Sequence, residues 1–226
     1  SGIPVRFVGH PLADAIKADP DRREARVALG LAPNKPVIAL LPGSRGSEID
    51  RLAPVFLAAA TRLQIAFPTL QCVMPAANVK AGQRLDQLSG GFPGSLTIVD
   101  GQSQTAMAAA DAVMIASGTA TLETLLVERP MVVAYATNAF TAWLLLNVGM
   151  LKSPYVSLPN LLTQDPAVPE LLQGAATADL LAGAMRLLLT RPAYAQAQTR
   201  QFAAVHHALQ RDADAEAADA ILELLQ

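Results

Sequence analysis

A short glycine-containing loop between a buried apolar run and a helical stretch is the first place where this sequence could bind a charged ligand. The segment reads LLPGSRGSE at residues 40–48 and contains Gly43, Ser44 and Arg45. Backbone N–H groups in such a loop, with the N-terminus of the following helix, attract anions, and the Arg45 guanidinium suits a pyrophosphate. The Gly-Lys-Ser/Thr ending of a Walker loop is missing. The alternative is an ordinary turn with a solvated arginine.

A second apolar run also ends in small residues where a helix begins. The segment ASGTATLE at residues 116–123 offers Ser117, Gly118 and Thr119, beside which a phosphate could approach the backbone closely. Glu123 follows about one turn into the helix, where its carboxylate could accept both hydroxyls of a ribose. The alternative is an ordinary helix start with a glutamate favoured by the helix dipole. Two such junctions in one sheet indicate a phosphate site more strongly than either alone.

A proline-rich segment supplies the third set of polar candidates. Asn160, Glu170 and Gln173 stand among apolar neighbours in VSLPNLL at 156–162 and VPELLQ at 168–173. Loops beyond a sheet often carry function, and these side chains could bond sugar hydroxyls. The alternative is local capping and turn chemistry.

Histidines and acidic pairs give weaker signals. His10 could face a ligand crevice from the end of the first predicted strand, and the alternative for it is a structural role. His206 and His207 are interpreted as surface residues within a helix. Asp212 and Asp214 match a metal-binding Asp-x-Asp pair, but they lie between alanine-rich helices, which favours helix capping. No other cluster has metal-ligand spacing, so we expect no metal and no cofactor.

The elements that must position these residues follow from alternating patterns. Short, branched apolar runs alternate with helical stretches up to Tyr135, and the runs are too apolar for a solvated face. The sequence therefore predicts an α/β fold, a Rossmann-like parallel sheet with helices on both faces and ligands beyond the carboxyl ends of its strands. The predicted strands are Val5–Val8, Val37–Leu41, Gln71–Met74, Leu96–Val99, Ala112–Ala116 and Met131–Tyr135.

Helical patterns separate these strands and then dominate the end of the chain. Leu151–Pro169 is predicted as a loop because four prolines interrupt it. The apolar stretch Phe140–Leu151 holds the only tryptophan and fits either a core helix or an interfacial one. The predicted helices are Arg22–Leu29, Ser47–Phe67, Lys80–Leu88, Gln104–Ala110, Ala120–Val127, Thr141–Val148, Ala178–Leu189, Ala193–Gln210 and Ala213–Leu225.

Composition narrows the class of protein. The 226 residues are 52% hydrophobic and 16% charged, which excludes a disordered chain, and the net charge of −2 gives no sign of a nucleic-acid partner. The single cysteine, Cys72, is compatible with cytoplasm. There is no signal-peptide pattern, and no apolar run reaches the ~18 residues of a membrane-spanning helix.

Five segments together resemble the lipid-A-disaccharide synthase family, glycosyltransferases of the GT-B architecture. They are VGHPLAD at 8–14, LLPGSRGSEI at 40–49, ASGTATLE at 116–123, PMVVAY at 130–135, and SPYVSLPNLL with VPELLQ within 153–173. The segments occur in the family's order and cover most of the chain.

This resemblance implies a reaction. A 2,3-diacylglucosamine group would pass with inversion from UDP to 2,3-diacylglucosamine 1-phosphate, forming a β-1,6 disaccharide without a metal. It further implies that Arg45 and Asn160 matter most to activity, that Glu123 contacts the ribose and that Gln173 lies near the donor sugar. The resemblance also implies a localisation: the protein would be cytoplasmic and peripheral to the inner membrane of a Gram-negative bacterium.

The resemblance also covers only the C-terminal half of the family's chains. We therefore expect a donor-binding half, inactive alone, without the N-terminal domain that should hold the lipid acceptor, a general base and the membrane contact. Two alternatives stay open. The first is another UDP-sugar enzyme, similar to UDP-N-acetylglucosamine 2-epimerase or a peptidoglycan transferase. The second is a non-catalytic nucleotide-sugar-binding module.

The end of the chain suggests a second copy as partner. We expect residues 1–190 to form the Rossmann-like domain and residues 191–226 to form helices that brace another domain or copy. Their apolar stripes can fold onto their own domain or swap into a homodimer, with hinges at Pro192 and at 211–213. The stripes consist of Phe202, Val205, Leu209, Ile221, Leu222 and Leu225.

Overall fold

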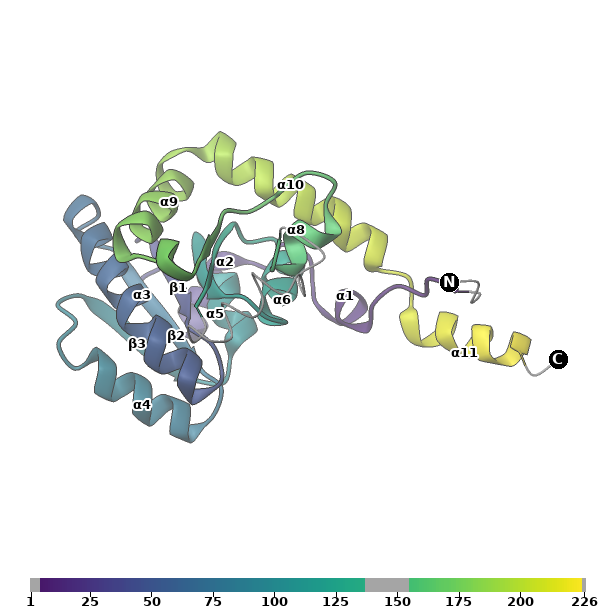
Figure 1. Cartoon of the computed structure of the whole chain (residues 1–226), viewed down its shortest axis with the longest axis horizontal. Helices are drawn as coiled ribbons and strands as arrows, with labels where there is room; N and C mark the ends of the chain where they lie inside the picture. The colour runs from purple at the N-terminus through teal and green to yellow at the C-terminus, as the bar shows by residue number, and fades with distance from the viewer. Residues whose placement is uncertain (1–4, 137–154, 225–226) are drawn as a thin grey trace.

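The computed structural model describes residues 5–136 and 155–224, and its centre is a parallel sheet. The six strands follow the order β3-β2-β1-β4-β5-β6, and every neighbouring pair is parallel. Figure 1 shows this sheet between two layers of helices. The strands are β1 (Val37–Leu41), β2 (Gln71–Ala76), β3 (Ser95–Asp100), β4 (Ala112–Ala116), β5 (Met131–Tyr135) and β6 (Glu170–Leu172).

Helices cover both faces because the central strands bury every side chain. All five residues of β1 are buried, and they alternate between a core with α3, α4 and α9 and a core with α1, α2, α5, α6 and α10. The helices are α1 (Pro11–Ala15), α2 (Arg22–Ala28), α3 (Gly46–Ala66), α4 (Val79–Ser89), α5 (Ser103–Ala109), α6 (Ala120–Leu126), α8 (Leu158–Leu162), the 3-10 turn η1 (Gln173–Ala175), α9 (Ala178–Thr190), α10 (Pro192–Leu209) and α11 (Ala213–Leu224).

The predicted Rossmann-like fold and five of the six predicted strands are confirmed, but the strand at Val5–Val8 is wrong. That segment is extended without joining the sheet, and Val5 and Phe7 are exposed. The short elements α1, α8 and β6 were not predicted. Strand β6 is half-buried and three residues long, and prolines precede it, so its pattern is weak. The predicted helix Thr141–Val148 lies outside the described residues.

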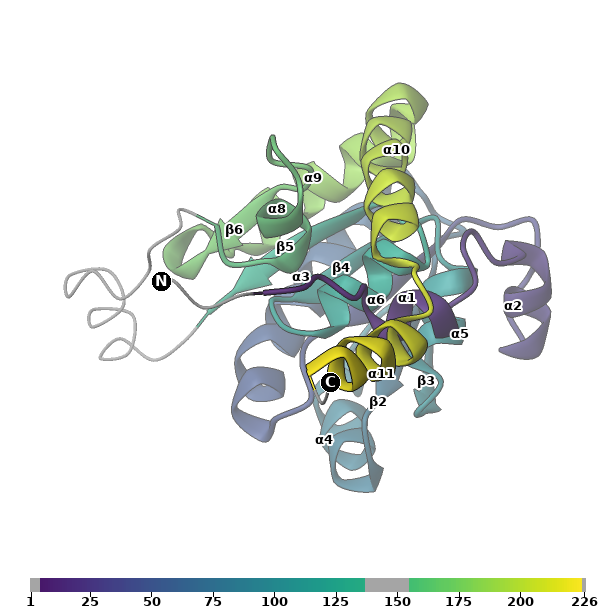
Figure 2. The same cartoon turned by 90° about the vertical axis from the view of Figure 1, so that its right-hand side faces the viewer.

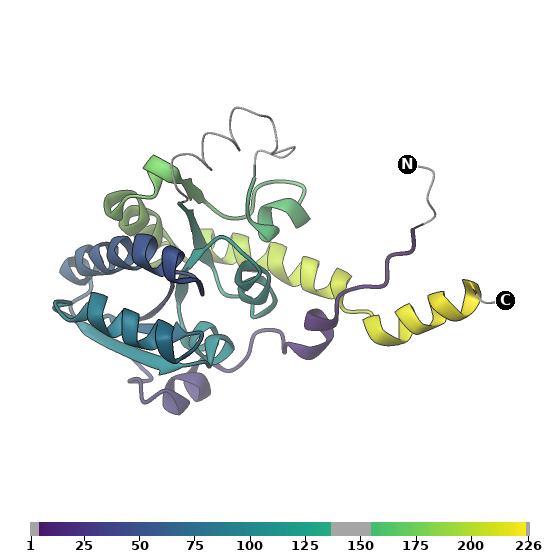
Figure 3. The same ribbon diagram turned by 60° about the horizontal axis from the view of Figure 1, so that its bottom comes forward.

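The two terminal segments form an arm that projects away from the sheet. Arg6 pairs with Glu216 at 3.0 Å and with Glu223 at 2.9 Å, and the Arg211 guanidinium lies 5.1 Å from the Phe7 ring centroid. Figures 1 and 3 show both segments projecting from the body, and in Figure 2 α11 crosses the front of the molecule near α1. The first segment thus pairs with the last helix instead of with the sheet.

The VGHPLAD motif anchors this arm. Gly9 has φ +87°, and a Cβ there would lie 2.6 Å from the Leu209 carbonyl oxygen. The His10 backbone N–H donates to the same oxygen at 2.9 Å. The Asp14 carboxylate accepts the N–H groups of residues 211, 212 and 213 at 2.8–3.0 Å, and chiefly the Ala213 bond lowers the pKa of Asp14. The motif therefore fixes the junction between α10 and α11.

The apolar stripe of α10 packs within its own domain. Phe202 and Leu209 are buried in the core that also contains α1 and α6. On α11, by contrast, Ile221 and Leu222 remain 60% and 57% exposed. Of the predicted stripe, only the part on α11 is thus open to a partner, and Leu225 lies outside the described residues.

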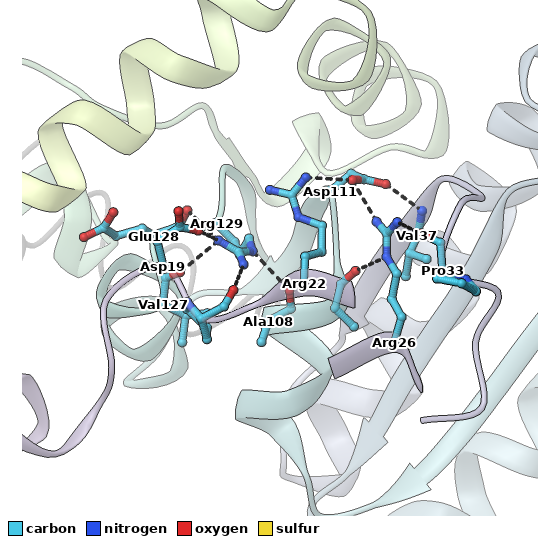
Figure 4. A network of polar contacts seen from close by, with 12 residues as sticks. Asp19, Arg22, Arg26, Pro33, Val37, Ala108, Asp111, Val127, Glu128 and Arg129 are labelled. Carbon is cyan, nitrogen blue, oxygen red and sulfur yellow. Dashed lines mark hydrogen bonds and ion pairs between the residues drawn. The ribbon is translucent and has the colours of Figure 1, made fainter. Parts of the chain in front are cut away.

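Buried arginines stabilise the edge of the sheet where the strands begin (Figure 4). The Arg129 side chain, which is 1% exposed, donates to Asp19 at 2.6 Å and to the carbonyl oxygens of Pro20 and Ala108 at 2.6 and 3.2 Å. Burial lowers the pKa of Arg129. A second cluster joins Arg26 to Asp111 at 2.8 Å. These charges lie at the amino ends of β4 and β5 and thus have a structural role.

Candidate functional site

A cavity of about 570 Å³ opens at the carboxyl ends of the central strands. The chain runs from β1 to β2 and β3 on one side and then returns to β4 on the other, so β1 and β4 are neighbours at the point where the strand order reverses. Such a crevice is where open α/β sheets bind ligands, and the volume suits a small organic molecule. The described lining comes from residues 43–45, Glu48, 75–77, Gly101, Ser103, 115–120 and Glu123, with Leu41 at its base.

The loop after β1 has the conformation expected of an anion-binding turn. Gly43 has φ +116°, and a Cβ there would lie 2.6 Å from the Glu48 Cβ, so a larger residue would displace the first turn of α3. Ser44 and Arg45 follow at the N-terminus of this 21-residue helix. The helix directs its first N–H groups and its positive dipole end toward the cavity.

Arg45 lies at the cavity mouth, as its sequence position suggested. Its side chain is 81% exposed and pairs with Glu48 through Nη1 and Oε1 at 3.0 Å. The Glu48 Oε2 also accepts the backbone N–H groups of Ser44 and Arg45 at 3.2 and 3.4 Å. We did not single out Glu48 from the sequence. The signal was present, because a glutamate three residues after a helix N-cap commonly accepts a hydrogen bond from the backbone at the helix start.

The second loop joins β4 to α6 and places Ser117, Gly118 and Thr119 in the cavity lining. The Ser117 backbone N–H donates to the Ala134 carbonyl at 2.9 Å, and its hydroxyl donates to the Val156 carbonyl at 2.9 Å. Ser117 therefore has no free donor for a phosphate. The N–H groups of Gly118 and Thr119 have no acceptor among the described residues, and both residues line the cavity. Of the three residues that the sequence singled out here, Gly118 and Thr119 thus offer backbone N–H groups that a phosphate could reach.

Glu123 projects into the cavity one turn into α6. Its Oε2 accepts a long hydrogen bond from Gln104 Nε2 at 3.4 Å, and its Oε1 has no hydrogen-bond partner within the described residues. Gln104 is the second residue of α5, and we did not single it out from the sequence as a site residue. A carboxylate held from one side in this way can accept two vicinal hydroxyls.

Asn160 does not line the cavity. It is 3% exposed, and its amide is bonded within the protein: Oδ1 accepts the Val168 N–H at 2.9 Å, while Nδ2 donates to the Val168 carbonyl at 2.9 Å and to Glu170 Oε1 at 2.8 Å. The alternative of local capping and turn chemistry therefore fits Asn160 better than a sugar contact.

Glu170 completes the same cluster. Its carboxylate accepts the N–H groups of Val156 and Ser157 at 2.9 and 3.0 Å and the Ser157 hydroxyl. The chain after Val156 is therefore tied to β6, and through Ser117 it is tied to the second cavity loop. We interpret Asn160 and Glu170 as residues that fix the segment from Val156 onward, which in turn holds the Ser117 hydroxyl of the β4–α6 loop.

The two remaining candidates lie apart from the cavity lining. Gln173 follows β6 with φ +51°, at the same edge of the sheet but two strands from β4. His10 is the N-cap of α1, where its Nδ1 accepts the Leu12 N–H at 3.1 Å. The structural alternative for His10 therefore fits its position.

No cluster of three metal-ligating side chains occurs within residues 5–136 and 155–224. Asp212 and Asp214 lie at the start of α11, where Asp14 supplies the side-chain contacts to the backbone. In the same described ranges, no helix is long and apolar enough to cross a membrane.

Solved structures place the fold in a class. The domain resembles UDP-GlcNAc 2-epimerase from Neisseria meningitidis, with TM-score 0.61 and 12% identity, over 89% of this chain and 49% of that chain. It also resembles the Anabaena protein HepE in complex with UDP and glucose, with TM-score 0.59 and 16% identity, over 96% and 55%. The fold is a Rossmann-like domain of the GT-B class, to which several glycosyltransferase neighbours belong.

Sequence relatives then define the family. The protein-family model described as lipid-A-disaccharide synthetase matches residues 1–221. Lipid-A-disaccharide synthase from Pseudomonas putida strain W619 is 53% identical over 225 residues, which cover 100% of this chain and 58% of the relative. The chain belongs to the lipid-A-disaccharide synthase family. It spans just over half the length of the curated relatives it matches.

Proposed function

We propose that this chain is the donor-binding part of a glycosyltransferase that makes the β-1,6 lipid A disaccharide. The observation that carries the proposal is the cavity between the β1 and β4 loops, which combines Arg45, two helix starts and Glu123 in a chain of this family. The donor would be UDP-2,3-diacylglucosamine, with its diphosphate near Arg45 and its ribose near Glu123. The relatives named lipid-A-disaccharide synthase support this assignment.

The proposed reaction transfers the diacylglucosamine group with inversion. The 6-hydroxyl of 2,3-diacylglucosamine 1-phosphate attacks the anomeric carbon, the bond to the UDP oxygen breaks, and the hydroxyl proton passes to a base outside this part of the enzyme. Negative charge grows on the departing diphosphate, where Arg45 and the N–H groups of the β1–α3 loop would stabilise it without a metal. Asn160 and Glu170 would support this step by holding the cavity wall, and Gln173 would lie toward the donor sugar.

The acceptor, the base and the membrane contact belong, in this proposal, to a second domain. That domain would close over the cavity from the carboxyl ends of the strands, at the cytoplasmic surface of the inner membrane. Residues 1–190 would form the donor domain, onto which α10 packs, and within residues 191–226 it is α11 that would brace the partner. The exposed Ile221 and Leu222 support a homodimer joined through α11. In light scattering across a hundredfold dilution, dissociation with rising dilution is expected, and a monomer at every concentration would contradict the dimer.

The experiment that tests the function restores the second domain. This chain is co-expressed with the remaining part of the Pseudomonas putida relative, and the purified pair is given labelled UDP-2,3-diacylglucosamine and the acceptor in EDTA. Labelled disaccharide is expected from the pair, and Arg45→Ala in this chain is the matched control that should lose it. Transfer from UDP-N-acetylglucosamine but not from the acylated donor, or strict need of a divalent ion, would contradict the proposal.

A further inference from the structure

The Glu48 carboxylate lies on the groups that would bind a phosphate in the β1–α3 loop. Its Oε2 accepts the backbone N–H groups of Ser44 and Arg45 at 3.2 and 3.4 Å, and its Oε1 pairs with the Arg45 guanidinium at 3.0 Å. These donors are the ones with which a loop at a helix N-terminus holds an anion. In the structure, therefore, a carboxylate of the protein itself occupies an anion-binding position.

The local geometry allows this carboxylate to reach the loop and also to leave it. Glu48 is in the first turn of α3, and it folds back over Gly43, where a Cβ would lie 2.6 Å from the Glu48 Cβ. Glycine thus leaves the room that the glutamate fills. The Glu48 side chain lines the cavity and is 30% exposed, so a ligand and solvent can both reach it.

The charges around the cavity make this arrangement unfavourable once a diphosphate arrives. The charged side chains in the described lining are Arg45, Glu48 and Glu123, which sum to one negative charge. A diphosphate at the Ser44 and Arg45 N–H groups would lie within a few ångströms of the Glu48 carboxylate. Like charges at that distance near a protein surface change an affinity by about tenfold or more.

We propose that Glu48 is an exchange partner of the diphosphate. The carboxylate holds the loop N–H groups and Arg45 while the site is empty, and it is displaced when the outer phosphate of the donor binds. It returns as UDP leaves, which weakens the hold on this product and keeps Arg45 in place for the next donor. The inference rests on the proposed function, because it assumes that a uridine diphosphate group binds between the β1 and β4 loops.

The test is the neutral variant Glu48→Gln, which keeps the size of the side chain and one acceptor oxygen. Calorimetry on the 226-residue chain is expected to show UDP binding about tenfold tighter than in wild type, UMP binding tighter by less, and uridine binding unchanged. The matched control is Glu123→Gln, the same chemical change at the other carboxylate of the cavity. It removes a ribose contact, so UDP should bind more weakly, and the two variants should move in opposite directions.

Several outcomes would overturn the exchange. If Glu48→Gln weakens UDP binding as Arg45→Ala does, Glu48 only orients Arg45, and an equal change for uridine and UDP would exclude competition with the phosphate. Thermal unfolding without ligand checks that the variant folds. If Glu48→Gln is unfolded, Glu48→Asp replaces it in the test, because its side chain is one methylene shorter and its carboxylate does not reach the N–H groups. Glu48→Asp should also bind UDP more tightly than wild type. Equal or weaker binding overturns the proposal. Wild type that binds no UDP refutes the proposed function itself, whereas wild type that binds UDP with no tighter variant refutes the exchange alone.

Discussion

Replacing Asn160 with alanine should destabilise the segment that braces the β4–α6 loop more than it changes ligand contacts. The substitution removes three hydrogen bonds, two buried ones with the Val168 backbone and a partly buried one with the Glu170 carboxylate. It also leaves the Val168 N–H and carbonyl without partners in a buried place. A neutral hydrogen bond contributes about 1 kcal/mol and one to a charged group about 1.5–3 kcal/mol, so the expected loss is about 3–5 kcal/mol. That is a large share of the stability of a typical domain.

Urea unfolding of wild type and Asn160→Ala measures this loss, and Thr163→Ala is the matched control. Thr163 lies in the same segment and donates one partly buried bond, to the Pro159 carbonyl at 2.8 Å, so its loss should be about 1 kcal/mol or less. Under conditions where Asn160→Ala is folded, its affinity for UDP-N-acetylglucosamine should stay within about threefold of wild type, as expected for a residue without ligand contact. If Asn160→Ala is as stable as wild type but has lost its affinity for UDP-N-acetylglucosamine, the positioning role is refuted and Asn160 is a ligand contact.

Three further predictions test other parts of the structure. Arg45→Ala should weaken the binding of UDP by about 1.5–3 kcal/mol and the binding of UMP by less, because the proposed function places the guanidinium near the outer phosphate. Calorimetry measures both affinities, and an equal loss would contradict that placement. Arg129→Met should lower the free energy of unfolding by about 3 kcal/mol, since it leaves buried carbonyls unpaired, whereas Arg22→Met in the exposed pair with Asp111 should cost under about 1 kcal/mol. The Asp14 carboxyl has a lowered pKa in the folded protein, so its anchoring of α11 is present above about pH 4 and is lost as the pH falls through that lowered pKa. In wild type, the opening of α11 that permits amide exchange should therefore increase only in acid. In Asp14→Asn, amide exchange in α11 should be faster than in wild type already at pH 7. Equal exchange in the variant and wild type at pH 7 would show that other contacts hold α11.

The central strands could be predicted because their sequences carry a strong local signal. The runs VIALL of β1 and AVMIA of β4 are wholly apolar, and burial on both faces is the state that such runs require. Val5–Val8 has a similar local pattern, but no sheet edge receives it, and its partners are Glu216, Glu223 and Arg211 far along the chain. Local pattern cannot reveal that a strand-like segment pairs with a distant helix.

The cavity was predictable in outline for the same reason, whereas its hydrogen bonds were not. Glycine-containing loops after two apolar strands indicated the cavity, and parallel strands bring such loops to one edge. Whether the Ser117 N–H is free depends on Ala134, and whether Asn160 is exposed depends on Val168 and Glu170. These partners come from separate segments, so the local sequence around Ser117 and Asn160 does not reveal their internal hydrogen bonds.

Titration of the 226-residue chain with UDP, UMP and uridine in EDTA tests the central claim most directly, because it needs neither the acceptor nor a second domain. Binding to the cavity through Arg45, the loop N–H groups and Glu123 predicts that UDP binds most tightly, UMP more weakly and uridine weakest, with one site per chain. Equal affinity for the three ligands, or no binding of UDP by the folded chain, would contradict the assignment of this cavity to the diphosphate of a nucleotide sugar.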